Sequence, residues 1–159
     1  AQLVVNMMNH KEIARDLFIE GYNCAQAVAI AFCDVTGLDE ALTARLSSSF
    51  GGGLGRLREV CGAVSGMAFV YGKTCVSAEN TPENKKKTYA ITQELSLRFK
   101  QEYGSLICQE LLSDMNLSVQ VGGEAEPRTE TYYKKRSCAD MVAFTAGMLE
   151  DYLKEQRKL

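Results

Sequence analysis

The chain has 159 residues, 46% of them hydrophobic and 24% charged, which is ordinary for a single globular domain. Its formal net charge of -2 argues against nucleic-acid binding, and no apolar run reaches the roughly 18 to 20 residues that a membrane-spanning helix needs. We therefore predict one domain over residues 1–159, with a loose tail at 1–8 that lacks the basic start of a secretory signal.

The cysteine content of the chain indicates the cellular compartment in which the protein works. The chain contains six cysteines, a smaller share than the roughly 8 to 10% found in disulfide-stapled proteins. A domain of this length also buries enough apolar surface to fold without such staples. We therefore expect a cytoplasmic protein whose thiols are reduced or reactive.

Helix-start signals predict a first helix from Asn9 to Gly21. Asn9 with Glu12 is an asparagine variant of the capping box, and Gly21 suits the left-handed backbone that commonly ends a helix. His10, the single histidine of the chain, falls at the first helical position, where we expect it to be exposed.

A second helix is predicted from Asn23 to Gly37 and a third from Asp39 to about Ser49. Asn23 and Asp39 are good N-caps, since their side chains accept hydrogen bonds from free backbone N–H groups. Apolar residues recur every three or four positions after Cys24, which places Cys24 in the first turn, facing the core.

A cluster of four glycines within residues 51–55 interrupts the chain. A fourth helix, from about Glu59 to Cys75, follows it and includes Gly62 and Gly66. Glycines spaced by four leave a smooth helix face that another backbone can approach closely, although each one weakens the helix by up to ~1 kcal/mol. We therefore predict an all-α fold, a compact single-domain bundle of six or seven helices around this glycine-containing central helix.

The fifth and sixth helices are predicted from two further start signals. Thr81 is a good cap and Pro82 suits the first helical position, so a long helix is expected to run to about Tyr103. Ser105 is predicted to cap a short helix after it, which places Cys108 in another first turn.

Residues 114–136 show no helical period and are predicted to form a long irregular loop, with one short strand over 117–121. The last helix follows, with Ser137 as its cap and Cys138 as its first residue. Because this loop joins the helix of Cys108 directly to Cys138, we expect it to lie over the cysteines as a lid.

Four cysteines share one predicted setting, the first turn of a helix: Cys24, Cys61, Cys108 and Cys138. Free backbone N–H groups and the positive end of the helix dipole lower the pKa of a thiol there. The remaining two, Cys33 and Cys75, lie inside or at the end of helices and are expected only to pack.

Cys61 has the strongest predicted activation. Arg56 and Arg58 precede it and favour its thiolate, and glycines on both sides leave it little steric cover. We therefore expect Cys61 to be the most exposed thiol and the attacking group, followed in reactivity by Cys138 and then by the other two cysteines of the set.

The spacing of these four cysteines leaves their chemistry open. No C-x-x-C pair occurs, which argues against a zinc ribbon or a thioredoxin-type site. Four thiols from four helices could form disulfides in thiol-based redox or electron-transfer chemistry, or could ligate zinc or an iron–sulfur cluster. A third hypothesis is a helical interaction protein in which the cysteines only pack, so the cofactor is left open between none, zinc and an iron–sulfur cluster.

The pattern of the four cysteines resembles the C_GCAxxG_C_C family of proteins, which is described as redox-active. One run matches the motif C-G-A-x-x-G of that family: Cys61, Gly62, Ala63 and Gly66. The other three cysteines match the separate cysteines of the family, whereas Cys33 and Cys75 lie outside the pattern. The segments G-Y-N-C-A-Q-A-V and F-G-G-G-L-G-R are also similar, so the likeness runs from about Ala14 to Leu153.

This resemblance implies a redox role for the four cysteines, and a thiol-dependent oxidoreductase is one form that such a role takes. It names no substrate for the site. The redox partner or small molecule that the protein acts on, and its oligomeric state, are therefore left open by the sequence.

Overall fold

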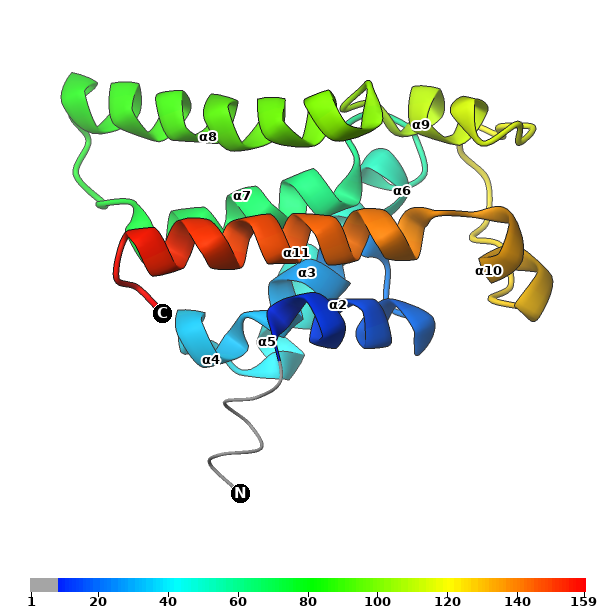
Figure 1. The fold of residues 1–159 in the computed structure, drawn as a ribbon, viewed down its shortest axis with the longest axis horizontal. Coiled ribbons are helices and arrows are strands. Elements are labelled where there is room, and N and C mark those ends of the chain that lie inside the picture. The colour runs from blue at the N-terminus through cyan, green and yellow to red at the C-terminus, as the bar shows by residue number, and fades with distance from the viewer. Residues whose placement is uncertain (1–8) are drawn as a thin grey trace.

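The computed structural model describes residues 9–159, so the predicted tail at 1–8 lies outside the described residues. The described chain is all-α, as predicted. Within it, one isolated antiparallel bridge joins the extended backbones of Val60 and Ile107. Within this range, no helix is both long and apolar enough to cross a membrane. The elements in Figure 1 are, in chain order, α2 (His10–Ile19), α3 (Cys24–Ala31), α4 (Cys33–Thr36), α5 (Glu40–Ser47), η1 (Ser48–Phe50), α6 (Gly51–Leu54), α7 (Gly62–Cys75), α8 (Pro82–Tyr103), α9 (Cys108–Asp114), α10 (Glu130–Lys135) and α11 (Cys138–Glu155).

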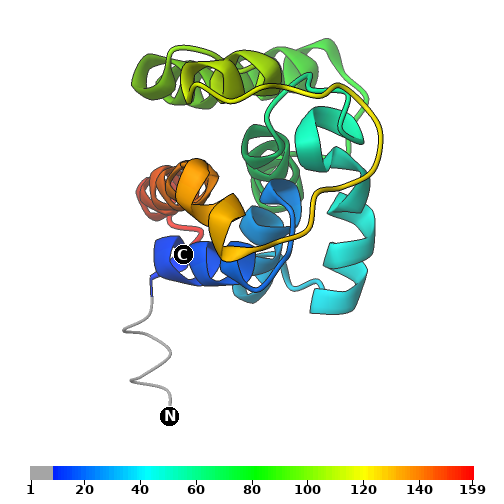
Figure 2. The same ribbon diagram turned by 90° about the vertical axis from the view of Figure 1, so that its right-hand side faces the viewer.

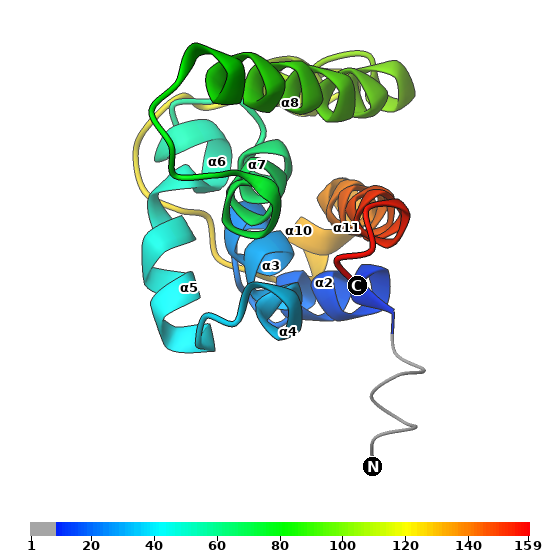
Figure 3. The ribbon, with the colours of Figure 1, turned by 90° about the vertical axis from the view of Figure 1, so that its left-hand side faces the viewer.

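Helix α7 lies at the centre of the bundle, as its two spaced glycines predict. It packs against α3, α8 and α11, while α2 packs against α3 and α11, and α5 packs against α3. Figure 3, in which α7 and α11 are seen nearly end on, shows α8 across the top and α5 on the left. Helices α3, α7 and α11 begin at the same end of the molecule, on the right in Figure 1, which gathers their N-termini there.

The predicted capping residues explain where most of the helices start. Asn23 forms a complete capping box with Gln26, in which each side chain bonds to the backbone of the other residue. Asn9, Asp39 and Thr81 each accept a hydrogen bond from a backbone N–H of the first turn. These bonds satisfy N–H groups that have no partner inside the helix, so local sequence sets these starts.

The central helix begins later than predicted, at Gly62 rather than Glu59. The reason is a tertiary contact that holds the preceding residues extended. The backbone N–H of Cys61 donates to the carbonyl oxygen of Leu106 at 2.8 Å, and the N–H of Cys108 donates to that of Glu59 at 2.6 Å. A backbone paired in this way cannot also close the first turn of α7.

The start of α9 also differs from the sequence prediction. The helix begins at Cys108, and Ile107 rather than Ser105 occupies the N-cap position. The hydroxyl of Ser105 instead accepts a hydrogen bond from the backbone N–H of Ile107, at 2.9 Å. Cys108 therefore lies at the first helical position.

The connection at 114–136 is more ordered than predicted. Its second half forms α10, which is capped by the hydroxyl of Thr129, an acceptor for the N–H of Tyr132 at 3.2 Å. The strand predicted over 117–121 is absent from the described residues, since no second strand lies beside it there. Figure 2 shows this connection running around the outside of the bundle between α9 and α10.

His10 is buried rather than exposed, which corrects the sequence prediction. Its ring stacks on Phe32, with ring centroids 4.3 Å apart, at the point where the predicted second helix divides into α3 and α4. Its Nδ1 lies 2.6 Å from Oε1 of Glu150, and its Nε2 lies 3.0 Å from each carboxylate oxygen of Asp34. These contacts fasten the start of α2 to both α4 and α11.

Helices α3 and α7 cross closely because Gly62 and Gly66 have no side chains. A Cβ at Gly66 would lie 2.7 Å from the carbonyl oxygen of Ala25, and one at Gly62 would lie 3.2 Å from the Cβ of Cys24. A carbon atom at the first of these distances overlaps the oxygen, so the helices would have to move apart. The crossing therefore sets how near the start of α3 comes to the start of α7.

Gly66→Ala should lower the free energy of unfolding by about 1 to 3 kcal/mol, because the added methyl group overpacks the crossing. Gly72→Ala in the same helix is the matched control, since a Cβ there meets nothing within 4 Å. That control should leave stability unchanged or raise it by up to ~1 kcal/mol through better helix propensity. Urea unfolding measures both, and equal effects of the two substitutions would contradict the close crossing.

Glu150→Gln tests the contacts of His10 through the pH dependence of stability. Burial raises the pKa of Glu150, but hydrogen bonds from His10 outweigh that effect, so its pKa lies below its ordinary value of 4.5. Stability from a depressed carboxyl pKa is present above the unfolded-state pKa and is lost as the pH falls through the folded-state value. We expect the variant to lose about 1 to 3 kcal/mol at neutral pH and to unfold with a flatter acid dependence below about pH 4.5. Urea unfolding across that pH range measures both effects. An unchanged acid dependence of the free energy of unfolding would show that the contact between His10 and Glu150 does not stabilise the fold.

Candidate functional site

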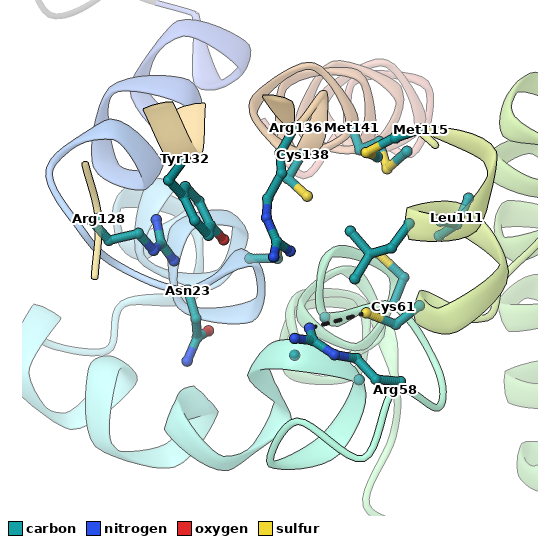
Figure 4. A pocket seen from close by; sticks show the side chains of 16 residues that line it. Asn23, Arg58, Cys61, Leu111, Met115, Arg128, Tyr132, Arg136, Cys138 and Met141 are labelled. Carbon is teal, nitrogen blue, oxygen red and sulfur yellow. Dashed lines mark hydrogen bonds between the residues drawn. The ribbon is translucent and has the colours of Figure 1, made fainter. Parts of the chain in front are cut away.

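Four cysteines line one pocket of about 60 Å³ at the end of the bundle where the helices begin: Cys24, Cys61, Cys108 and Cys138 (Figure 4). Three of them are the first residues of α3, α9 and α11, and Cys61 is the N-cap of α7. Each of the six cysteines is a free thiol, and Cys33 and Cys75 do not line this pocket. The structure thus brings the predicted set of four together and leaves the other two apart.

Cys61 and Cys108 are brought together by a short antiparallel backbone contact. It consists of the hydrogen bonds from Cys61 to Leu106 and from Cys108 to Glu59 that also delay the start of α7. The turn of α6 packs against this contact, since a Cβ at Gly53 would lie 2.8 Å from the Cβ of Cys108. Gly53 has a φ of 72°, so both space and backbone conformation require glycine there.

The thiols of Cys24 and Cys138 are neighbours where α3 and α11 begin, and each shifts the pKa of the other. The Cys138 thiol, together with burial, raises the pKa of Cys24 well above its ordinary value. The Cys24 thiol lowers the pKa of Cys138 despite burial, with further lowering from the guanidinium group of Arg136 and smaller effects of Arg128 and Arg58. Cys138 is therefore the member of the set that ionises most readily.

Cys61 is not the exposed and activated thiol that the sequence predicts. Only 6% of its surface is exposed, and burial raises its pKa to about 12. The nearby backbone N–H groups of Ala63 and Val64 act in the opposite direction but do not compensate. The helix start favours the thiolate, as expected, yet exclusion of water disfavours it more strongly.

Arg58 contacts Cys108 rather than Cys61, which corrects a second expectation. Its Nη1 donates a hydrogen bond to the sulfur of Cys108 across 3.7 Å, the dashed line in Figure 4. Burial raises the pKa of Cys108, and the guanidinium group opposes that rise. Arg56, the other arginine expected to favour a thiolate, does not line the cysteine pocket but faces an adjoining cavity.

Three residues that the sequence analysis did not single out also line the pocket: Arg128, Tyr132 and Arg136. The guanidinium carbons of Arg128 and Arg136 lie 4.8 and 4.5 Å from the centroid of the Tyr132 ring, and Figure 4 shows the ring between them. Arg136 had a signal in the sequence, since it stands just before the helix of Cys138. Arg128 had none, because the backbone carbonyl oxygens that it binds, those of Phe18 and Tyr22, are distant in the chain.

The segment 114–136 therefore lies against the cysteines, in the position that a lid would occupy. Arg128 fastens it to the bundle by donating from Nη1 to the carbonyl oxygen of Phe18 and from Nη2 to that of Tyr22, both at 3.1 Å. Opening and closing of this segment stay a prediction.

The geometry of the four cysteines does not support the alternative of a metal centre. Among residues 9–159, no three side chains of His, Cys, Asp or Glu are grouped so that they could hold a metal ion. A structural zinc site needs four ligands around one point, with Zn–S distances of about 2.3 Å, and a cubane cluster also takes four thiolates. These thiols are instead distributed around the pocket that they line.

Comparison with known proteins finds one family. A family model described as "Putative redox-active protein (C_GCAxxG_C_C)" matches residues 22–152. No curated protein and no solved structure matches the chain. The matched range contains all four pocket cysteines and the segment 114–136.

Brief treatment of the reduced protein with iodoacetamide should label Cys138 first, because its pKa is the one that is lowered. Cys108 should follow, and Cys24 and Cys61 should react last. Mass spectrometry of labelled peptides over a pH series measures this order. Cys24→Ala should slow labelling of Cys138 by about threefold to tenfold at neutral pH, since the neighbouring thiol that lowers its pKa is lost. Labelling of Cys61 before Cys138 would instead support the sequence interpretation.

Proposed function

Because the chain belongs to the C_GCAxxG_C_C family, whose model matches residues 22–152, we propose that its redox chemistry is thiol–disulfide exchange by Cys138 and Cys24. The family description supports a general redox role. We assign that role to the sulfur atoms of Cys138 and Cys24. Cys138 acts as the attacking thiolate and Cys24 as the resolving thiol. The protein is then a thiol-dependent oxidoreductase of a reducing compartment such as the cytoplasm, which regenerates the free thiols.

The position of the two thiols in one pocket, at the first residues of α3 and α11, carries this proposal. A thiol attacks a disulfide best when its pKa lies near the surrounding pH, and Cys138 is the pocket cysteine whose pKa is lowered. Cys24 stays protonated until the second step, because its pKa is raised. Neighbouring thiols that face one pocket can form a disulfide, which requires Cα atoms roughly 4.4 to 6.8 Å apart.

The reaction balances as two successive exchanges. The thiolate of Cys138 attacks one sulfur of a substrate disulfide, so that a bond from its Sγ to the substrate forms while the S–S bond of the substrate breaks. The departing half leaves as a thiolate and takes the proton of Cys24. Cys24 then attacks Sγ of Cys138 and expels the other half as a thiolate. A Cys24–Cys138 disulfide remains, and two electrons have passed from the protein to the substrate.

Cys61 and Cys108 take no step in this reaction. Both have a raised pKa in the reduced protein, which makes them poor nucleophiles. They line the pocket and, through their paired backbones, hold the start of α9 against the start of α7. The remaining hypothesis, in which all the cysteines only pack, predicts no exchange at any of them.

Reaction with hydroxyethyl disulfide should convert the reduced protein to a form with a single new disulfide, between Cys24 and Cys138. Peptide mapping identifies the bond, and thiol titration should show a loss of two thiols. Cys24→Ala should stop the reaction at a mixed disulfide on Cys138, because the resolving thiol is missing. Cys138→Ala should slow the first step by roughly a hundredfold, since the remaining thiols are mostly protonated.

Cys33→Ala and Cys75→Ala are matched controls, because these cysteines lie outside the pocket. Each should react at the wild-type rate and give the same disulfide. A mixed disulfide that accumulates on Cys61 or Cys108 in the Cys24→Ala variant would overturn the assignment, as would the absence of any reaction.

A further inference from the structure

We infer that the cavity beside the cysteine pocket binds a carboxylate group, and that the substrate is a small disulfide carrying such a group. The disulfide part of this inference rests on the proposed function, whereas the carboxylate part rests on the cavity alone. The cavity has a volume of about 220 Å³. We call it the arginine vestibule after the four arginines that line it: Arg56, Arg58, Arg128 and Arg136.

The arginine vestibule has an excess of positive charge. Four guanidinium groups line it, and the carboxylate that lines it with them belongs to Glu126. Arg58 and Arg128 make their hydrogen bonds to backbone carbonyl oxygens, a thiol and a phenol rather than to carboxylates. Arginines gathered in a partly enclosed cavity concentrate anions there, since the protein walls screen less than water does.

Arg56 carries two buried donor atoms that no group within residues 9–159 satisfies. The residue is 9% exposed, yet its Nε and Nη2 have no hydrogen-bond partner among the described residues. The nearest carboxylate oxygen, Oε1 of Glu126, lies 3.9 Å from Nη2, which is beyond hydrogen-bonding distance. A buried guanidinium without partners is costly, and an anion in the vestibule would supply them.

The backbone at this point is also unusual. Arg56 and Arg58 have φ values of 65° and 62°, in the left-handed region that residues other than glycine rarely adopt. The N–H of Gly122 donates to the carbonyl oxygen of Arg56 at 2.7 Å, which holds the turn in this form. The backbone is therefore strained at Arg56 and Arg58, the two arginines of the vestibule that are most deeply buried.

Glu126 indicates that the anion is a carboxylate. Its Oε1 accepts a hydrogen bond from Nη2 of Arg136 at 2.7 Å, so a carboxylate already lies at the edge of the vestibule. The side chain is about half exposed, so a ligand that displaced it would find Arg136 free to bind. The planar fork of a guanidinium group matches the two oxygens of a carboxylate, and Arg56 offers two such donors.

The vestibule opens onto the thiols. The two cavities share six lining residues: Asn23, Gly52, Arg58, Arg128, Tyr132 and Arg136. A molecule whose carboxylate lies on Arg56 can therefore extend past Arg58 toward Cys138. The cysteine pocket itself holds about 60 Å³, enough for a disulfide group but not for a bulky partner. A small, flexible, carboxylate-bearing disulfide fits both volumes.

Calorimetry with thiodipropionate tests the carboxylate site without any redox chemistry, because this thioether carries two carboxylates and no S–S bond. The reduced protein should bind it and should not bind the neutral thioether thiodiglycol. Arg56→Gln should weaken binding by about tenfold, the effect of one charge-assisted hydrogen bond. Glu126→Gln should tighten binding severalfold, since the competing carboxylate is gone. Arg45→Gln, at an exposed position outside the vestibule, is the control with the same change of charge and should bind as wild type does.

Several results would overturn the carboxylate site. They are absence of thiodipropionate binding, equal binding of thiodiglycol, or equal weakening by Arg45→Gln and Arg56→Gln. Competition by inorganic phosphate at lower concentration than thiodipropionate would assign the vestibule to phosphate instead. If Arg56→Gln does not fold, Arg136→Gln and Glu126→Gln still give opposite expected changes, a loss and a gain.

Reduction of three small disulfides then separates the inference from the proposed function. The rate constant should be largest for the anionic dithiodipropionate, smaller for neutral hydroxyethyl disulfide and smallest for cationic cystamine. Arg56→Gln should reduce the preference for dithiodipropionate over hydroxyethyl disulfide by about tenfold. Equal rates for all three would overturn the substrate assignment and leave the exchange reaction in place. Binding of thiodipropionate without reduction of any disulfide would overturn the exchange reaction and leave the carboxylate site in place.

Discussion

The close backbone contact between α3 and α7 is the constraint on which the cysteine pocket depends. Gly62 and Gly66 let α7 approach the backbone of Ala25 within a distance that a side chain would prevent. The start of α3 is thereby held beside the start of α7, which places Cys24 next to Cys61. Helix α11 packs on both of these helices and contributes the third start. Two glycines that lower helix propensity thus bring the starts of the cysteine-bearing helices α3 and α7 together.

The four thiols share a helix start but differ in chemistry, and the magnitudes explain why. A charge at a helix end gains about 0.3 to 1 kcal/mol, whereas full burial can shift a pKa by 3 to 5 units, at about 1.4 kcal/mol each. Burial therefore decides at Cys61, whose pKa rises to about 12. At Cys138 the neighbouring thiol of Cys24 and nearby guanidinium groups outweigh burial, so its pKa is lowered. Partners across the pocket, rather than position on a helix, distinguish one thiol from the next.

The arginines connect the pocket to the rest of the fold. Arg58 bonds both to the sulfur of Cys108 and to the carbonyl oxygen of Gln120, so it joins the thiol site to the segment that covers it. Arg128 and Arg136 reach the same site from either side of α10 and stack on Tyr132. The positive charge around the thiols therefore comes from two parts of the chain. Arg58 precedes α7, and Arg128 and Arg136 flank α10.

Local sequence signals predict most of the helices and the four cysteines of the pocket, but not α10 or the positions of Arg128 and Tyr132. Caps such as Asn23 and Thr81, the spacing of Gly62 and Gly66, and the repeated placement of cysteine at a helix start are local signals, because each depends on hydrogen bonds or close packing within a few residues of the chain. Those signals were enough to predict an all-α bundle and the set of four cysteines.

The tertiary structure alone decided which thiol is activated and what surrounds it. Three features depend on which helices pack together: the burial of Cys61, the effect of Cys24 on the pKa of Cys138, and the contact of Arg58 with Cys108. The same holds for His10, which the sequence places at an exposed helix start and the fold places between two carboxylates. A pKa depends on the distance to water and to charges, and those distances join residues that are far apart in the chain.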